Sequence, residues 1–345
     1  MSVRETVRAH VETWRPYTLW YVGLVGLGGA AVVSAEAGAP PHPWRLVAAW
    51  AAPTAAWLGG HYLGDYFDRD LDAGSKPHRP IPSGRLRPRT AVLCGGLCVA
   101  VLIALAVTGG WRTTLAAVLG VLGIVVYSRW AKARGIAGNL VRGALGALAL
   151  LYGACAAGQW PASATAAVLV LAAVFWLHDT TSNLVGTLRD IDGDRTGGYF
   201  TLAARRGAAY VVWTVLGLYA ATIGAALAIV PIGVGEHRGP VIYLITLAVV
   251  VALGAVALAP LVTHRAAMSV AIGLRAHEVL VVERLVLASG AVGLGLGVGW
   301  QLGLLVPLAA LTWRTQHIMR PRHELGTART AAALVSRPVP VEGES

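Results

Sequence analysis

Residues 45–64 read RLVAAWAAPTAAWLGGHYLG, an apolar run that is followed at once by the acidic segment DYFDRDLD over residues 65–72. A helix of about 20 such residues is long enough to cross roughly 30 Å of hydrocarbon. The acidic segment then begins where the helix reaches the membrane surface. This junction between an apolar span and a cluster of carboxylates guides the interpretation of the rest of the chain.

The composition places the whole chain in the same class. Of its 345 residues, 56% are hydrophobic and only 13% are charged, whereas a soluble domain carries about 25% charged residues. This excludes a soluble enzyme, a disordered protein and a fibrous protein. The net charge of +11 comes from basic residues scattered between apolar stretches, which indicates membrane topology and lipid headgroups and no nucleic-acid partner.

Nine apolar stretches predict an all-α membrane protein with about nine transmembrane helices. We expect two four-helix halves plus one helix, with a central cavity, and an amphipathic N-terminal arm over 1–16. The bundle is predicted over 17–312, and a polar, mobile tail over 313–345. The predicted spans are 17–35, 45–64, 91–110, 113–127, 139–157, 162–185, 208–232, 240–263 and 284–312.

Lysine and arginine positions orient these spans. Most lie in loops that share a face with the N-terminus, and the opposite face carries only Arg45, Arg112 and Arg238. By the positive-inside rule, the protein belongs in the cell membrane with the N-terminal face in the cytoplasm. Nine spans place the C-terminal tail outside, although it carries five arginines; eight or ten segments is the alternative.

All eight aspartates fall in two short windows. The first window ends the second span and the second window ends the sixth, so both lie at the cytoplasmic face four spans apart. An internal duplication would produce this pattern. The aspartates are Asp65, Asp68, Asp70, Asp72, Asp179, Asp190, Asp192 and Asp194.

The spacing indicates which carboxylates act together. Asp65, Asp68 and Asp72 stand at i, i+3 and i+7, on one face of a helix. Asp190 and Asp194 stand at i and i+4, whereas Asp70 and Asp192 fall off these stripes. Clustered carboxylates repel, so they need either arginine and lysine partners or divalent cations such as Mg²⁺. The basic loops that follow each window favour metal beside bound phosphate, and hence a diphosphate site.

At these residues the chain resembles the UbiA-type intramembrane prenyltransferases. Residues 64–72 (GDYFDRDLD) with 76–85 (KPHRPIPSGR) are similar to the family's first motif and its basic loop, and residues 189–195 (RDIDGDR) are similar to its second motif. Between them, Tyr127, Ser128, Lys132 and residues 135–139 resemble the loop that the family places after its fourth helix.

The resemblance implies a set of site residues and a cofactor. It implies two Mg²⁺ ions, one on each aspartate motif, with the same carboxylates serving in catalysis: Asp65, Asp68, Asp72, Asp190 and Asp194. It implies that the diphosphate is held by Lys76, Arg79, Arg85, Tyr127, Lys132 and Arg195. His61 and Asn183 are expected to support these groups, His61 as a hydrogen-bond partner of Asp65.

Three positions depart from the family pattern. Gly64 stands where the family has Asn, His61 stands where many members have another Asn, and Thr187 occupies a position that is often acidic. We still expect the site to bind metal, but we expect these three changes to alter the geometry in which the acceptor binds. His178, beside Asp179, is assigned a structural role.

The activity implied is Mg²⁺-dependent transfer of an isoprenyl group from an allylic prenyl diphosphate to an acceptor, aromatic or otherwise lipophilic, with release of diphosphate. One alternative is a UbiA-type terpene cyclase that uses the prenyl diphosphate alone. A remote alternative is a non-catalytic cation transporter, against which both aspartate clusters lie at one membrane face and not at mid-depth. The signature of a CDP-alcohol phosphotransferase is absent from the sequence.

Overall fold

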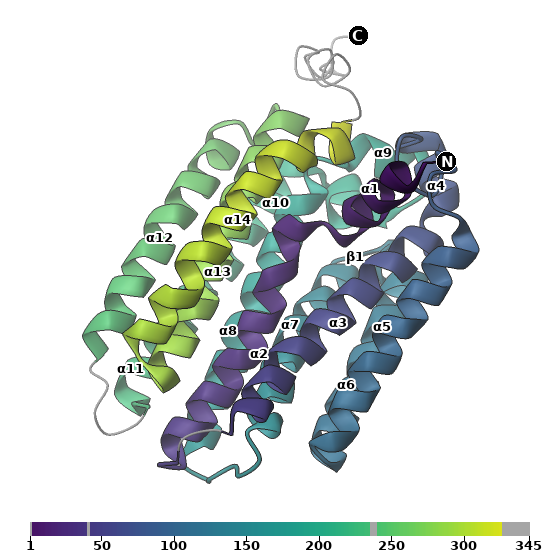
Figure 1. The fold of residues 1–345 in the computed structure, drawn as a ribbon. Helices are drawn as coiled ribbons and strands as arrows, with labels where there is room; N and C mark the ends of the chain where they lie inside the picture. The colour runs from purple at the N-terminus through teal and green to yellow at the C-terminus, as the bar shows by residue number, and fades with distance from the viewer. Residues whose placement is uncertain (1, 40–41, 235–239, 326–345) are drawn as a thin grey trace.

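The computed structural model describes residues 2–39, 42–234 and 240–325, and nearly all of them are helical. Within this part of the chain, ten long helices form a bundle (Figure 1). They are α2 (Pro16–Glu36), α3 (Pro43–Phe67), α5 (Pro88–Thr108), α6 (Trp111–Val126), α7 (Ala137–Ala156), α8 (Ala164–Thr187), α10 (Leu202–Leu227), α12 (Pro240–Thr263), α13 (Val270–Leu296) and α14 (Val298–Leu325).

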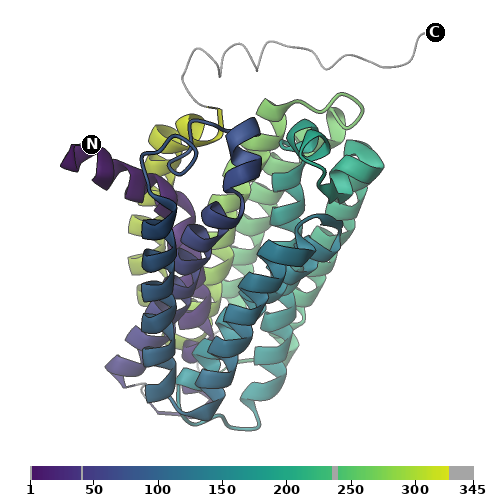
Figure 2. The same cartoon turned by 90° about the vertical axis from the view of Figure 1, so that its right-hand side faces the viewer.

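Short elements join the long helices. Six of them lie at the end of the bundle that carries both aspartate motifs. They are α1 (Val3–Trp14), α4 (Arg69–Ser75), the π-helical turn η1 (Tyr127–Ala131), β1 (Arg134–Gly135), α9 (Ile191–Thr196) and β2 (Phe200–Thr201). The four-residue α11 (Ile229–Ile232) follows α10 at the opposite end. Figure 2 shows the long helices running the full height of the bundle between these two sets of connections.

Eight helices of the described chain are long and apolar enough to cross a membrane, which agrees with a multi-pass membrane protein. The long helices α3 and α14 are not among the eight, although they lie alongside the others (Figure 1). The first eight predicted spans each coincide with a long helix of the bundle. The all-α membrane fold is therefore confirmed, and the count of nine is approximate.

The ninth predicted span, 284–312, is wrong because it contains a chain reversal. Gly297 has a φ of +89° and separates α13 from α14. Glycine adopts this backbone conformation without a Cβ clash and commonly ends a helix. Apolar residues continue on both sides of Gly297, so hydropathy alone does not reveal the turn.

The additional helix changes where the chain ends. Residues 313–325, predicted to start a mobile tail, instead continue α14 back to the end of the bundle where α1 lies (Figure 1). The rest of the predicted tail, with Arg329 and Arg337, lies outside the described residues. This helix brings a C-terminal segment to the face that carries both aspartate motifs.

Close helix contacts in the bundle rest on small residues. A Cβ added at Gly153 of α7 would lie 1.7 Å from the carbonyl oxygen of Gly26 in α2, and one added at Gly29 would lie 2.1 Å from the carbonyl oxygen of Leu150. Glycines of this kind let backbones approach and gain van der Waals contact within lipid. The α2–α7 crossing is therefore fixed by glycine on both helices.

The two halves of the chain repeat one arrangement at the site. In the first half the short helix α4 follows the second long helix, α3; in the second half α9 follows α8. Strands β1 and β2 pair in parallel, with Arg134 opposite Phe200 and Gly135 opposite Thr201. This pairing ties the loop after η1 to the chain that follows the second aspartate motif.

Candidate active site

The first aspartate motif lies where one helix ends and another begins. Helix α3 stops at Phe67, and Asp68 is at once the C-terminal cap of α3 and the N-terminal cap of α4, with φ −87° and ψ −1°. The motif is thus bent at its centre, and Asp65 and Asp72 belong to different helices. The helix predicted to carry all three aspartates is therefore interrupted, although Asp65, Asp68 and Asp72 still line one cavity.

Asp72 and Asp68 of the first motif each pair with a basic side chain. Asp72 is buried, and both of its oxygens accept from Nη1 of Arg79, at 2.9 and 2.8 Å. Asp68 accepts from Nζ of Lys132, which follows η1. Burial opposes the charge on both bases, but Asp72 raises the pKa of Arg79 and Asp68 raises the pKa of Lys132.

Asp65 pairs with a base that sequence analysis did not single out. Arg15, between α1 and α2, donates from Nη2 to one oxygen of Asp65. The other oxygen, Oδ2, is buried and has no hydrogen-bond partner within the described residues. His61 does not bond to Asp65, contrary to expectation; its Nδ1 lies 3.0 Å from the carbonyl oxygen of Trp14.

In the second motif, the two predicted carboxylates have different surroundings. Asp190 is bonded by Nζ of Lys76 at 3.0 Å and by Nε of Arg189 at 3.3 Å. Burial alone would raise the pKa of Asp190, but these two cations outweigh it and lower the pKa. Among the described residues, Asp194 accepts only from the Thr201 hydroxyl, at 3.0 Å, and burial together with the charge of Asp190 raises its pKa to about 6.

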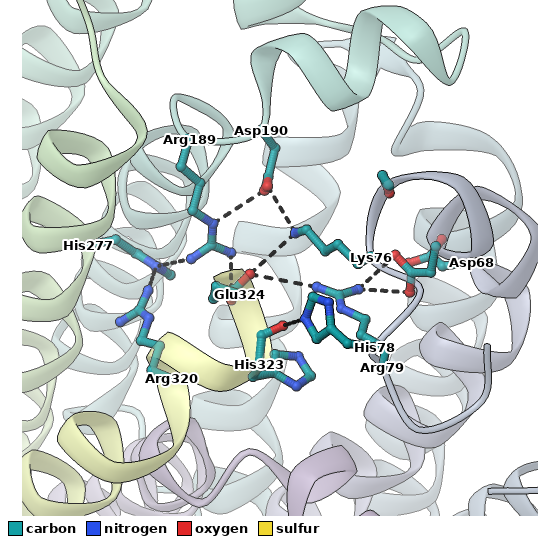
Figure 3. Close-up of polar contacts among 12 residues, drawn as sticks. Asp68, Lys76, His78, Arg79, Arg189, Asp190, His277, Arg320, His323 and Glu324 are labelled. Carbon is teal, nitrogen blue, oxygen red and sulfur yellow. Dashed lines mark hydrogen bonds and ion pairs between the residues drawn. The ribbon is translucent and has the colours of Figure 1, made fainter. Parts of the chain in front are cut away.

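A carboxylate from α14 lies between the two motifs (Figure 3). Glu324 is 3.2 Å from Nζ of Lys76, 3.7 Å from Nη2 of Arg79 and 3.3 Å from Nη2 of Arg189. Its side chain is only 8% exposed. Three cations from two separate loops therefore already share one anion, and we call Lys76, Arg79 and Arg189 the cation triad.

A cavity of about 360 Å³ extends from both motifs into the bundle. Besides the aspartates and the triad, Tyr127, Lys132 and Asn183 line it, and Asn139 donates to Asn183 at 2.8 Å. Part of the cavity lining is apolar and consists of Val22, Pro53, Leu102, Ala117, Ile124, Leu145, Leu148 and Ala149, with Tyr152. We call this the apolar arm.

Other predicted site residues do not reach the cavity. Arg85 turns toward Glu12, at 2.7 Å, and Arg195 is exposed and donates to the carbonyl oxygen of Ala204. Asp70 is exposed and so is Asp192, in agreement with their positions off the predicted stripes. Of the residues predicted to hold the diphosphate, Arg85 and Arg195 therefore lie outside the cavity lining.

His178 has the structural surroundings expected of it. It is fully buried, and its Nε2 lies 2.5 Å from Oε2 of Glu283, which also accepts from the Tyr219 hydroxyl at 3.2 Å. Neither His178 nor Glu283 lines the cavity.

Sequence reasoning missed several cavity residues. Arg142 and Arg284 could have been found, because an ionisable residue inside an apolar span is a functional signal in its own right. Arg15 lies at the border of the first predicted span, and Arg189 is the first residue of the second motif, so both lie next to features that the sequence identifies. No sequence pattern points to Glu324, because it lies in a segment without a motif.

The carboxylates do not converge on one point. Among the described residues there is no group of three or more histidine, cysteine or acidic side chains placed to hold a metal ion. Four of these carboxylates are instead paired with arginine or lysine, so cation binding there would require the ion pairs to open; they are Asp65, Asp68, Asp72 and Asp190.

Comparison with known sequences follows the same motifs. A sequence model of the UbiA prenyltransferase family matches residues 24–271. The digeranylgeranylglyceryl phosphate synthase of Thermococcus gammatolerans is 32% identical over 208 residues, which cover 59% of this chain and 72% of that protein. The enzyme of the same name from Ignicoccus hospitalis is 33% identical over 238 residues, covering 67% of this chain and 75% of the relative.

Solved structures share the fold. A UbiA homologue from Archaeoglobus fulgidus bound to DMAPP and Mg²⁺ superposes with a TM-score of 0.57 at 16% identity, covering 78% of this chain and 98% of the other. The apo UbiA homologue from Aeropyrum pernix K1 has a TM-score of 0.62 at 18% identity, covering 78% and 96%.

Proposed function

The chain belongs to the UbiA prenyltransferase family, and we propose that it transfers an isoprenyl group from an allylic prenyl diphosphate to a lipophilic, aromatic acceptor. The observation that carries this proposal is a single cavity joining the cation triad and both aspartate motifs to an apolar arm. One end suits a diphosphate and the other suits an isoprenoid tail. We place this site at the cytoplasmic face.

The donor set supports Mg²⁺ as cofactor. Carboxylate oxygens are the ligands that Mg²⁺ prefers, and the buried Oδ2 of Asp65 has no partner among the described side chains. We assign Asp65 and Asp68 to one ion and Asp190 with Asp194 to a second. When bound, Mg²⁺ supplies positive charge that stabilises the departing diphosphate. Asp72 uses both oxygens on Arg79, so we assign it to orienting that base.

The cation triad is proposed to bind the diphosphate. Its three side chains already hold an anion, the carboxylate of Glu324, between the two motifs. A diphosphate carries more charge and more acceptor oxygens, and it would replace Glu324 there. The triad would stabilise charge that develops on the leaving group, the interaction that lowers the barrier to C–O cleavage. Lys132 and Tyr127 lie at the same end of the cavity.

The apolar arm is proposed to hold the isoprenoid tail. Along α7 its lining extends from Leu145 to Tyr152, and α5 and α6 contribute Leu102, Ala117 and Ile124. Such walls exclude water from the allylic carbon, so the cation formed there reacts with an acceptor before it is hydrolysed.

The relatives' names suggest a second acceptor class. Both relatives compared above are named as synthases of digeranylgeranylglyceryl phosphate, so a glyceryl phosphate acceptor is the alternative to an aromatic one. The chemistry at the diphosphate is the same in both cases.

Product analysis tests this function. The full chain in lipid nanodiscs is incubated with Mg²⁺, radiolabelled allylic diphosphates of increasing length and either acceptor class. We expect label in an acceptor adduct with the wild type, and none with Asp68→Ala combined with Asp190→Ala.

The matched control is Asp70→Ala combined with Asp192→Ala, which removes one exposed aspartate from each motif and should retain the adduct. Label in a free cyclic hydrocarbon would show that the protein is a cyclase and not a transferase. Intact diphosphate under every condition would refute both activities.

A further inference from the structure

The N-terminal helix α1 presents one face to the bundle and a second, apolar face outward. Ala9 and Thr13 are fully buried, and Ala9 belongs to a small apolar cluster with α3. Val3, Val7 and Trp14 lie within about 40° of one another around the helix axis, on a different side from the buried pair. They are 81%, 56% and 38% exposed. We call these three residues the exposed stripe.

The third face of α1 is charged. Arg4, Glu5 and Arg8 are all exposed and lie about a third of a turn from the exposed stripe, on the side away from the buried residues. A helix with one side toward protein, one toward water and one that is apolar fits the boundary between lipid and water. Arginines at the edge of the stripe suit the phosphates of lipid headgroups.

The place of α1 in the chain puts it at the membrane surface. Only Arg15 separates it from α2, which is long and apolar enough to span a membrane. Figure 2 shows the purple N-terminal helix projecting from the bundle across the direction of the long helices. Trp14, beside this junction, is of a residue type enriched at membrane interfaces. The lipid leaflet that α2 enters is therefore the surface within reach of the exposed stripe.

The junction between α1 and α2 is strained. Arg15 has a φ of +49°, and among the described residues no other side chain except glycine is found at a positive φ. In this left-handed conformation the Cβ crowds a carbonyl oxygen. Such a conformation persists only where the surrounding contacts enforce it. The contacts of α1 therefore hold Arg15 in a state that it would leave if α1 were released.

These contacts lead directly to the first aspartate motif. Nε1 of Trp14 donates to the hydroxyl of Tyr62, on α3, at 2.6 Å. The guanidinium of Arg15 donates to one oxygen of Asp65, and the other oxygen is buried without a partner among the described side chains. Any cation that binds Asp65 through both oxygens must first displace Arg15. Release of α1 would relieve the strain and free this carboxylate.

We propose that α1 docks into the lipid leaflet at this end of the bundle through the exposed stripe, and that this contact holds Arg15 on Asp65. The leaflet thereby restrains cation binding at the first motif. The inference rests on the proposed function in one respect, the assignment of Asp65 to a metal ion. It does not depend on which prenyl donor or acceptor the protein uses.

Fluorescence quenching locates the exposed stripe. In a variant without Cys94, Cys98 and Cys155, a cysteine introduced by Val7→Cys carries bimane on the full chain in phosphatidylcholine nanodiscs. We expect a lipid-borne nitroxide to quench it at least threefold more strongly than bimane placed by Arg8→Cys, and aqueous iodide to show the reverse order. Stronger iodide quenching at Val7 would overturn the proposal. Protection from both quenchers would also overturn it, because a second copy of the chain would then cover the stripe.

Cation binding without substrate tests the link to the site. Mn²⁺ takes the same oxygen ligands as Mg²⁺, and electron paramagnetic resonance measures its binding to the full chain in the same nanodiscs. We expect Arg15→Gln, and likewise Val3→Ser combined with Val7→Ser, to tighten one Mn²⁺ site about tenfold, because a charged hydrogen bond no longer competes. The matched control is Val241→Ser combined with Val298→Ser, two exposed valines at the opposite end of the bundle (Figure 1). It should retain the wild-type affinity.

The outcomes separate the parts of this proposal. Arg15→Lys keeps the charge and should bind Mn²⁺ as the wild type does, which distinguishes loss of the ion pair from damage to the junction. If Arg15→Gln tightens Mn²⁺ binding but the serine pair in the stripe does not, the leaflet does not control the site and the proposal fails. Weaker binding in Arg15→Gln would also overturn it, since Arg15 would then assist the cation.

These results are independent of the transfer assay. If no adduct forms but the Mn²⁺ affinities shift as expected, the role of α1 stands and the proposed function fails. If adducts form and the stripe variant binds Mn²⁺ like the wild type, the function stands and the role of α1 fails. Absence of Mn²⁺ binding in every protein would refute the metal assignment together with the restraint, and quenching alone would then decide where α1 lies.

Discussion

At the scale of single residues, two arginines that flank one motif have different surroundings. Arg189 and Arg195 flank the second aspartate motif six positions apart, and both are basic. Arg189 is turned into the cavity, where it contacts Glu324 and Asp190, whereas Arg195 is exposed and bonds to a backbone carbonyl. Local structure at α9, and not residue type, decides which guanidinium faces the cavity.

This contrast predicts the effect of two matched substitutions. Arg189→Gln should lower kcat/KM for the prenyl diphosphate by about 10²–10³-fold, the typical loss when one preorganised donor to a developing anion is removed. Arg195→Gln should change kcat/KM by less than about threefold, since its charge is screened by water. Steady-state kinetics with purified protein measures both. Equal losses in the two variants would contradict the assignment of Arg189.

At the scale of elements, α14 places a charged side chain in the site. Its last turn holds Glu324 against the cation triad, which is also the proposed binding site of the diphosphate, so the two anions would compete for the same cations. Each base contacts Glu324 at a different distance, and the carboxylate holds the loops of both motifs together. The C-terminal helix therefore contributes to the site although it carries no motif of its own.

Removal of this internal anion should favour substrate. Glu324→Gln is expected to tighten binding of inorganic diphosphate by roughly tenfold, because charge-assisted hydrogen bonds of about 1.5–3 kcal/mol no longer have to be broken. Calorimetry measures the affinity, and the KM for prenyl diphosphate should fall in parallel. Glu36→Gln, at the opposite end of α2, is the control. Weaker diphosphate binding in Glu324→Gln would show that the carboxylate assists substrate.

The part of α7 that lines the cavity leads to a second prediction at this scale, which concerns the length of the prenyl chain. Lining residues run from Gly138 to Tyr152, about 21 Å of helix, and Tyr152, whose ring is buried, is the last of them along α7. Tyr152→Ala should shift the preferred donor toward longer prenyl chains, with the ratio of kcat/KM for a 25-carbon over a 20-carbon diphosphate rising about tenfold. The buried Tyr243, outside the cavity, provides the control Tyr243→Ala. An unchanged ratio would move the end of the tunnel elsewhere.

At the scale of the whole molecule, the reversal at Gly297 resolves a conflict in the charge pattern. Ten long helices return the end of α14 to the side of α1, so the arginines in the last part of α14 lie toward the same end of the bundle as the other basic loops (Figure 1). With nine crossings they would have lain on the opposite side. The positive-inside bias is then consistent from α1 to the end of α14.

This topology predicts which positions share a membrane side. In a variant without Cys94, Cys98 and Cys155, single cysteines introduced by Ser2→Cys and Arg322→Cys should react with a membrane-impermeant maleimide from the same side. A cysteine introduced by Arg112→Cys should react only from the other side. Labelling of intact cells against inverted vesicles distinguishes them and also tests the cytoplasmic placement of the site. Reaction of the first two from opposite sides would exclude ten crossings.

Much of this protein is determined by sequence alone, because its signals are local. Long apolar runs predict helices wherever they occur, and the two aspartate windows identify the end of the bundle that carries the site. Asp68, Asp190 and Lys76 were all expected there, and the structure brings them to one cavity. The turn at Gly297 was missed because hydropathy is equally high on both of its sides.

Only the tertiary structure decides which charges meet. Lys76 and Glu324 are 248 positions apart, yet they form an ion pair beside the aspartates. Arg142 and Arg284 come from different helices and converge on one indole ring. The Coulomb energy of an ion pair depends on the distance between the charges and on their removal from water, and the order of residues in the sequence gives neither quantity. The sequence therefore predicts which types of residue make up the site, whereas the tertiary structure decides which of them pair.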